Sequence, residues 1–199
     1  MTTPEREDQL FLVRHGETEW SRNGRHTSYT DLPLTPEGER VAAGLKERLA
    51  GESFDLVLTS PRQRARRTAE LAGYPDAEVD DDLVEWNYGD YEGITTAEIR
   101  ETVPGWTVWT HPCPGGETAE DVGSRADGVL ARTAEALDRG DVVLVGHGHF
   151  SRVLVARWIG LPATEGVRFA MEAPSWAVLG DERGVPRLDH VNLTPKGRP

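Results

Sequence analysis

Arginine and histidine side chains gather at three places along this chain, each directly after a short apolar run. The groups are Arg14-His15-Gly16, the sequence SPRQR at 60–64 and the sequence GHGH at 146–149. If the three groups meet, two histidines and at least two arginines occupy one small volume, which is electrostatically costly without an anion. A phosphate group supplies that anion, and glycine leaves backbone N–H groups open to it. These residues therefore predict a phosphate-binding pocket.

Each of these groups also has an ordinary structural interpretation. A single histidine at the end of a strand is more often a satisfied structural residue than a catalyst. The arginines of 62–67 could equally form the solvated face of a helix. The same residue types at three independent strand ends are much less expected by chance than a single histidine or arginine at one of them. The conjunction, and no single residue, favours a functional site.

Strands and helices must alternate to bring the three groups together. Short apolar runs predict buried strands, and apolar periodicity predicts a helix after each. The predicted strands are 10–13, 56–59, 142–145, 176–179 and 187–191, with a turn near 181–184, and the predicted helices are 36–50, 62–72, 118–137 and 149–159. This alternation indicates an α/β layered domain with a mostly parallel sheet, where ligands bind at the carboxyl ends of the strands.

Length and composition favour one globular domain spanning 1–199. No repeat or linker divides the chain, although 83–116 mixes Gly, Pro and Trp and is expected to form an excursion over the sheet edge. The net charge is −12, and 76–141 holds 17 acidic but only 4 basic residues, which disfavours nucleic acid. No stretch of about 20 apolar residues predicts a membrane span. A polar N-terminus and one cysteine, Cys113, favour the cytoplasm.

Five ordered motifs resemble the histidine phosphatase superfamily, also called phosphoglycerate mutase-like. They are LVRHGETEW, TDLPLTPEGE, SPRQRARRTAELAG, EWNYGDYEG and VGHGHFSR, covering roughly residues 10–155. The resemblance implies a three-layer α/β/α sandwich. It also implies that His15 is the nucleophile, forming a phosphohistidine, while Arg14, Arg64 and His147 surround the phosphoryl group. Glu85 matches the proton donor of the family, and no cofactor or metal is implied.

The resemblance also implies substrate contacts. Thr18, Thr27 and Ser28 fall on positions that commonly contact substrate, and Gly148 and His149 follow the second histidine. Many members carry asparagine six residues after the nucleophile. This chain has Ser21 there and Asn23 two residues later, so either could contact phosphate. His26 lies nearby in sequence and could touch the substrate or not.

The composition of the stretch between Glu85 and His147 distinguishes a phosphatase from a mutase. The resemblance implies that cofactor-dependent mutases hold a bisphosphate with a basic insertion in this stretch. Here 86–146 carries 11 acidic residues and 4 well-separated arginines. Water should therefore reach the phosphohistidine, which favours a phosphatase of the sugar-bisphosphatase-like branch. The expected partner is a small phosphorylated metabolite.

Other interpretations stay open from the sequence. A metal hydrolase could use His15, His147, His149 and Glu85, but converging arginines would repel a divalent cation. A chain that binds a phosphorylated ligand without turnover is another alternative, as is a mutase. Apolar residues at 167–171 could belong to a homodimer interface.

Overall fold

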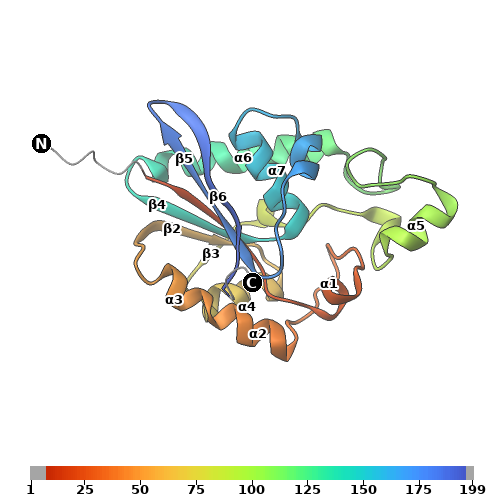
Figure 1. Cartoon of the computed structure of the whole chain (residues 1–199), viewed down its shortest axis with the longest axis horizontal. Helices are drawn as coiled ribbons and strands as arrows, with labels where there is room; N and C mark the ends of the chain where they lie inside the picture. Colours follow the sequence, from red (N-terminus) through yellow and green to blue (C-terminus); the bar gives the residue numbers. More distant parts are fainter. Residues whose placement is uncertain (1–7, 196–199) are drawn as a thin grey trace, which may run out of the picture.

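A six-stranded sheet forms the centre of the computed structural model, which describes residues 8–195 (Figure 1). The strands are β1 (Leu10–Arg14), β2 (Phe54–Thr59), β3 (Glu78–Val79), β4 (Asp141–Gly146), β5 (Ser175–Glu182) and β6 (Val185–Leu193). Their order across the sheet is β3-β2-β4-β1-β5-β6. The strands β3, β2, β4 and β1 pair in parallel with their neighbours, whereas β5 pairs antiparallel with both β1 and β6. The prediction of a mostly parallel sheet is confirmed.

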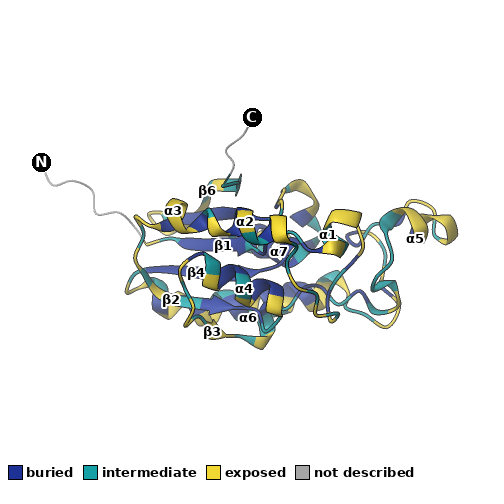
Figure 2. Ribbon diagram, turned by 90° about the horizontal axis from the view of Figure 1, so that it is seen from below, coloured by how far each residue is buried: buried dark blue, intermediate teal, exposed yellow. Residues whose placement is uncertain are grey.

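Helices cover both faces of this sheet. They are α1 (Glu19–Asn23), α2 (Pro36–Ala43), α3 (Leu45–Leu49), α4 (Gln63–Leu71), α5 (Thr96–Thr102), α6 (Ala119–Leu137) and α7 (Gly148–Trp158), with 3-10 turns at Asp81–Leu83, Gly89–Tyr91 and Ala163–Arg168. In Figure 1, α6 and α7 lie on one side of the sheet, and α2, α3 and α4 lie on the other. Figure 2 shows β1 and β4 in the colour of buried residues, whereas the edge strands β3 and β6 are more exposed. This is the expected α/β/α sandwich.

Strand alternation divides the core into two apolar layers. Side chains of successive strand residues point to opposite faces of a sheet. Leu10 and Leu12 of β1 therefore join the cluster beneath α6 and α7, whereas Phe11 and Val13 join the cluster beneath α3 and α4. β4 is buried along its whole length, as expected of a strand covered on both faces.

The parallel register places the three predicted groups side by side. Arg14 pairs with Gly146, and Thr59 pairs with Val145. The backbone N–H of His15 then donates to the Gly146 carbonyl at 2.9 Å, continuing the ladder one residue past the strand. Ser60 does the same with Val145 at 2.9 Å. The carboxyl ends of β1, β2 and β4 therefore share one edge, on the side that carries α1 and α5 (Figure 1).

Two predicted elements differ from the structure. The predicted helix 36–50 is two helices, because the Gly44 N–H bonds to the carbonyl of Val41 in a tight turn and the ladder restarts. The short helix α1 and the helix α5 were not predicted. Both begin with a capping box, at Thr18 and at Thr95, in which the N-cap and the third helical residue satisfy each other's N–H groups.

The segment 83–116 extends beyond the carboxyl ends of the strands. It includes α5, which lies farther from the sheet than the other helices (Figures 1 and 2). Its inner residues are anchored, since Trp86 and Trp106 are each only 1 % exposed. An isolated bridge between Arg25 and Thr95 joins it to the loop after α1. Among the described residues, no helix combines the length and apolar character that crossing a membrane requires.

Candidate active site

A pocket of about 210 Å³ opens at the carboxyl ends of β1 and β4. Its walls come from the loop after β1, the start of α7, the 83–116 segment and the loop before β5. The lining residues are Arg14, His15, Ser21, Gly24, Arg25, His26, Thr27, Glu85, Tyr88, Thr96, Gly148, His149, Arg152 and Met171. This position is the one at which open α/β sheets bind ligands.

A hydrogen bond fixes the orientation of the His15 imidazole. His15 is 5 % exposed, and its Nδ1 lies 2.7 Å from the carbonyl oxygen of Gly16. A carbonyl only accepts hydrogen bonds, so the neutral ring carries its proton on Nδ1 and leaves a lone pair on Nε2. The Gly16 N–H in turn donates to Thr68 at 3.0 Å, which fixes the loop. Position 16 has no space for a side chain, because a Cβ on Gly16 would lie 2.8 Å from the carbonyl oxygen of Gly38 in α2.

Unpaired N–H groups surround this ring. Four buried side-chain nitrogens in the described part of the chain have no hydrogen-bond partner: the Nε atoms of Arg14, Arg62 and Arg64, and Nδ1 of His147. Native structures rarely leave buried polar atoms unpaired. All four belong to the three strand-end groups, and the rings of His15 and His147 are 5.2 Å apart. The cluster has the donors that an oxyanion needs.

Ser60 sets the orientation of His147. Its hydroxyl lies 2.7 Å from Nε2 of His147 and accepts the Arg62 N–H at 3.4 Å. When the Ser60 hydroxyl donates its proton to Nε2, the neutral His147 ring carries its own proton on Nδ1. That N–H is the unpaired one, so it is available to an anion.

The two arginines are held by backbone carbonyls. Arg64 is fully buried, and its guanidinium donates to the carbonyls of Thr30 at 3.0 Å and Ser28 at 3.1 Å. Arg14 donates to the carbonyl of Met171. Gly148 leaves room for Arg14, since a Cβ at Gly148 would lie 3.0 Å from the guanidinium carbon. Backbone carbonyls therefore position both cations, and Glu85 is the carboxyl group whose charge acts most strongly on each of them.

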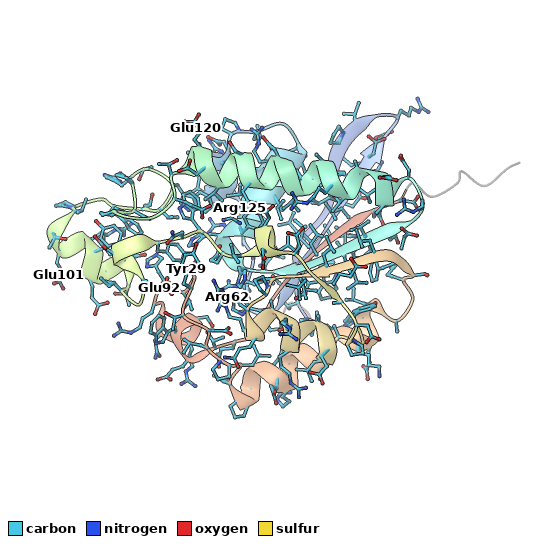
Figure 3. All side chains as sticks on the ribbon, turned by 180° about the vertical axis from the view of Figure 1, so that it is seen from behind. Tyr29, Arg62, Glu92, Glu101, Glu120 and Arg125 are labelled. Atoms are coloured by element: carbon cyan, nitrogen blue, oxygen red, sulfur yellow. The ribbon has the colours of Figure 1, made fainter. Side chains whose placement is uncertain are left out.

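Arg62 occupies the rim of the cluster. Its guanidinium carbon lies 5.0 Å from the centre of the Tyr29 ring, and Tyr29 is 57 % exposed. Figure 3 shows the two side chains next to each other, with Glu92 close by. The carboxylate of Glu92 accepts the backbone N–H groups of Ser28 and Thr30, which shapes the loop that Arg64 also binds.

Glu85 faces the pocket and binds the start of α7. Its Oε1 accepts the N–H groups of Trp86 at 2.9 Å and Phe150 at 2.8 Å, and its Oε2 accepts that of His149 at 3.0 Å. Oε2 takes only one such bond and has room for a proton. Amide N–H groups thus surround this carboxyl group. Arg125, visible in Figure 3, donates to the carbonyl of Val84 at 2.8 Å and holds the segment.

Burial and charge keep the histidines neutral. Burial, followed by the charges of Arg64 and Arg14, lowers the pKa of His15 well below its usual value. The same causes, burial first and then Arg64, lower the pKa of His147. A protonated imidazole would have no lone pair for attack. The environment therefore maintains the reactive form of His15 in neutral and mildly acidic solution.

The predicted substrate residues divide into two sets. Ser21 and Thr27 line the pocket, as do Gly148 and His149. Thr18 is fully buried as the N-cap of α1, and its hydroxyl accepts the Ser21 N–H at 3.1 Å. Asn23 is exposed and lies outside the pocket lining. The Ser28 hydroxyl donates to the Glu85 carbonyl at 3.2 Å, so Ser28 supports the loop that carries Glu85.

Several lining residues were not singled out from the sequence. Arg25, Tyr88, Thr96, Arg152 and Met171 enter from segments far apart in the chain. Tyr88 lies inside the quoted motif EWNYGDYEG, which was the one available signal for it. Arg152 follows the GHGH group by a single helical turn, which places it over the same pocket.

Other reactive side chains lie outside this site. Among residues 8–195, no cluster of three or more His, Cys, Asp or Glu side chains is arranged to hold a metal ion. Cys113 is buried, and burial raises the pKa of its thiol to about 11. At that pKa the thiol stays protonated and is a poor nucleophile.

Comparison with known proteins identifies the family. The family model described as histidine phosphatase superfamily (branch 1) matches residues 10–194. The chain belongs to this superfamily. It is similar to an acid phosphatase of Mycobacterium tuberculosis, with 47 % identity over 98 % of this chain and 97 % of the relative. A sedoheptulose 1,7-bisphosphatase of Saccharomyces cerevisiae is 36 % identical over 77 % of this chain and 68 % of its own length.

A solved structure gives the same result for the fold. It is the product of an open reading frame of Mycobacterium tuberculosis, with 47 % identity and a TM-score of 0.92 over 96 % of this chain and 100 % of that one. The resemblance first seen in the five motifs is confirmed, as is the phosphoglycerate mutase-like fold. With its family and its phosphatase relatives, the chain is a phosphoric monoester hydrolase.

Proposed function

We propose that this chain is a metal-independent phosphatase that hydrolyses small phosphomonoesters through a phosphohistidine at His15. The observation that carries the proposal is the cluster of buried nitrogens, without partners among the described residues, on the three strand ends that meet at the buried His15. Phosphoryl transfer mainly requires positioning and neutralisation of charge on the equatorial oxygens. Arg14, Arg64 and His147 supply that charge and those N–H groups.

The first step transfers the phosphoryl group to the enzyme. Nε2 of His15 attacks phosphorus, and the N–P bond forms while the P–O bond to the alcohol breaks. Glu85 gives its proton to the departing oxygen, so the alcohol leaves neutral. Arg14 and Arg64 hold the oxygens of the transferring group throughout.

The second step regenerates the enzyme. Water attacks the phosphorus of the phosphohistidine, and the ionised Glu85 takes one proton from it. The N–P bond breaks with its electrons returning to Nε2 of His15. Inorganic phosphate leaves, and Glu85 is protonated again for the next cycle.

The substrate class follows from the relatives and the pocket together. One relative is a sedoheptulose 1,7-bisphosphatase, and the pocket of about 210 Å³ has room beyond a single phosphate. Sugar phosphates or bisphosphates are therefore the substrates we favour. Arg25 and Arg152 on the wall could face a second anionic group.

A mutase is the alternative activity, and a non-catalytic binder of phosphorylated ligands is another. The acidic composition of 86–146 argues against retention of a bisphosphate, since three of its four arginines are paired with carboxylates. Arg125 bonds Glu117, Arg132 bonds Asp80, and Arg139 bonds Asp55. The filled positions His15 and Glu85 favour turnover over binding alone.

One screen separates these activities. Sugar phosphates, sugar bisphosphates and 3-phosphoglycerate are incubated with the purified protein, with and without a strong chelator. The proposal predicts release of inorganic phosphate at an unchanged rate in the chelator. Isomerised phosphoglycerate without phosphate release would identify a mutase instead, and loss of activity in the chelator would identify a metal enzyme.

The cellular setting is also part of the proposal. We expect a cytoplasmic enzyme without a bound cofactor, acting on a small metabolite, with no nucleic acid or membrane partner. Homodimerisation through 167–171 stays a prediction. In the structure Val167 is 51 % exposed, whereas Met171 is 4 % exposed and belongs to the pocket wall. Val167 and Ala170 are thus the exposed apolar residues of this segment, and a second copy would contact them.

A further inference from the structure

Two histidines line the pocket beside the phosphate cluster without a role in the steps above. His26 comes from the loop after α1, and His149 lies in the first turn of α7. Their rings are nearly parallel, with 15° between their planes and 6.3 Å between their centres. Segments more than a hundred residues apart thus place two imidazoles side by side.

Aromatic rings hold both imidazoles in place. The His26 ring contacts the edge or face of Tyr88 at 4.7 Å and Trp106 at 5.3 Å. The His149 ring contacts Trp109 at 5.3 Å. Trp106 and Trp109 are outside the pocket lining and lie behind the histidines. The 83–116 segment therefore serves as a rigid support for this wall.

Hydrogen bonds fix the tautomer of His26. Its Nδ1 lies 2.6 Å from the carbonyl oxygen of Ile94, which can only accept. The proton of the neutral ring is thus on Nδ1, and Nε2 has a free lone pair. Burial lowers the pKa of His26 and favours this neutral form. His26 consequently presents a hydrogen-bond acceptor.

His149 has the opposite tautomer. Its Nδ1 lies 2.6 Å from the hydroxyl of Tyr88, which has no other hydrogen-bond partner among the described residues. Tyr88 is 2 % exposed, and burial raises the pKa of its hydroxyl well above the usual value. The hydroxyl therefore donates its proton to Nδ1, because that bond satisfies it. The proton of the neutral His149 ring is on Nε2, which presents a donor.

We propose that His26 and His149 form an acceptor–donor pair that recognises a hydroxyl group of the substrate next to its phosphate. A hydroxyl both donates and accepts, so it satisfies Nε2 of both rings at once. No hydrogen bond to either Nε2 occurs within residues 8–195. A substrate without that hydroxyl would leave the donor and the acceptor unpaired when it displaces water. This inference rests on the proposed phosphatase activity and narrows its substrates to polyol phosphates.

The test compares two esters of matched size. Glycerol 3-phosphate and propyl phosphate have the same carbon chain and differ in two hydroxyl groups. The wild-type kcat/KM should be about tenfold or more higher for glycerol 3-phosphate, the value expected from about one good hydrogen bond. In His26→Phe, which keeps an aromatic ring, this ratio should fall to about one. Tyr88→Phe, which frees the tautomer of His149, should lower it part of the way.

His190→Phe is the matched control. His190 is an exposed histidine of β6, outside the pocket lining, and its replacement should leave the ratio unchanged. A wild-type ratio near one would overturn the inference. So would an equal loss for both esters in His26→Phe, because that pattern indicates a structural role.

Binding separates the inference from the proposed activity. Calorimetry measures the Kd of both esters for the His15→Asn variant. Preference for glycerol 3-phosphate without turnover by the wild type would support the recognition pair and overturn the phosphatase proposal. Turnover of both esters without any preference would do the reverse. If neither ester binds, both are wrong.

Discussion

Replacing Glu85 by glutamine separates its two roles, as proton donor and as partner of α7. Glutamine keeps the shape of the side chain but exchanges one carboxylate oxygen for an NH2 group. The amide oxygen can still accept the N–H groups of Trp86 and Phe150. The NH2 group then faces the N–H of His149, which loses its acceptor.

The stability loss follows from these contacts. A buried N–H group that loses its acceptor costs about 1–3 kcal/mol. Glu85→Gln should therefore lower the free energy of unfolding by about 1–3 kcal/mol, through the His149 N–H. The folded enzyme remains measurable at that cost, since typical domains have about 5–15 kcal/mol.

The kinetic loss should depend on the leaving group. General acid catalysis contributes about 10²- to 10⁴-fold. An alkyl phosphate needs that proton, so its kcat/KM should fall by this factor in Glu85→Gln. Nitrophenyl phosphate has a leaving group that departs without a proton and should lose far less. Both substrates are assayed with the same enzyme preparation, at a temperature where the variant is folded by circular dichroism.

Glu92→Gln provides the matched control. Glu92 also accepts backbone N–H groups, from Ser28 and Thr30, but it is outside the pocket lining. Its replacement should lower stability without a leaving-group effect. Equal losses for alkyl and nitrophenyl phosphates in Glu85→Gln would refute the role of Glu85 as an acid and leave only its contact with α7.

Three further predictions concern the phosphate cluster. Arg64→Ala should lower kcat/KM by about 10²- to 10³-fold. The loss should exceed that of Arg62→Ala, because Arg64 is fully buried and Arg62 lies at the rim. A larger loss for Arg62→Ala in the same assay would reverse the assignment. Gly148→Ala should raise KM for phosphate esters, since its Cβ would displace Arg14; an unchanged Kd for inorganic phosphate by calorimetry would contradict this. The pKa of His15 is lowered on folding, so the unfolded chain takes up protons first as pH falls below about 6.5. Between pH 7.5 and 5.5 this residue should remove about 1.4 kcal/mol of stability in urea titrations, and His15→Asn should show a correspondingly weaker dependence.

Much of the scaffold was predictable because its signals are local. The buried strands are short apolar runs, and the long helix 118–137 matches the observed α6 almost to the residue. The register of β1 and β4 then follows from parallel pairing, which is why the strand-end groups could be expected to meet.

The missed elements depended on weaker local signals or on tertiary contacts. The capping box Thr95-x-x-Glu98 was present in the sequence and could have predicted α5. The break in 36–50 comes from the tight turn at Gly44, whose N–H bonds to the Val41 carbonyl, and the apolar periodicity of this stretch gives no sign of that turn.

The candidate site divides in the same way. Arg14, His15 and His147 follow strands and were placed by the strand pattern alone. The surroundings of Glu85 were not predictable, because two of its three amide partners belong to a helix that starts more than sixty residues later. His26 is held in the pocket wall by a hydrogen bond to the carbonyl of Ile94, which is distant in the sequence, so this position was not predictable either.

The central claim is that His15 carries the phosphoryl group, and trapping tests it most directly. The enzyme is mixed with a radiolabelled phosphate ester, quenched in alkali within milliseconds and digested for mass spectrometry. The account predicts an acid-labile, alkali-stable phosphate on His15 that is absent from His15→Asn. Label on another residue such as His147, or turnover in His15→Asn at the wild-type rate, would contradict it.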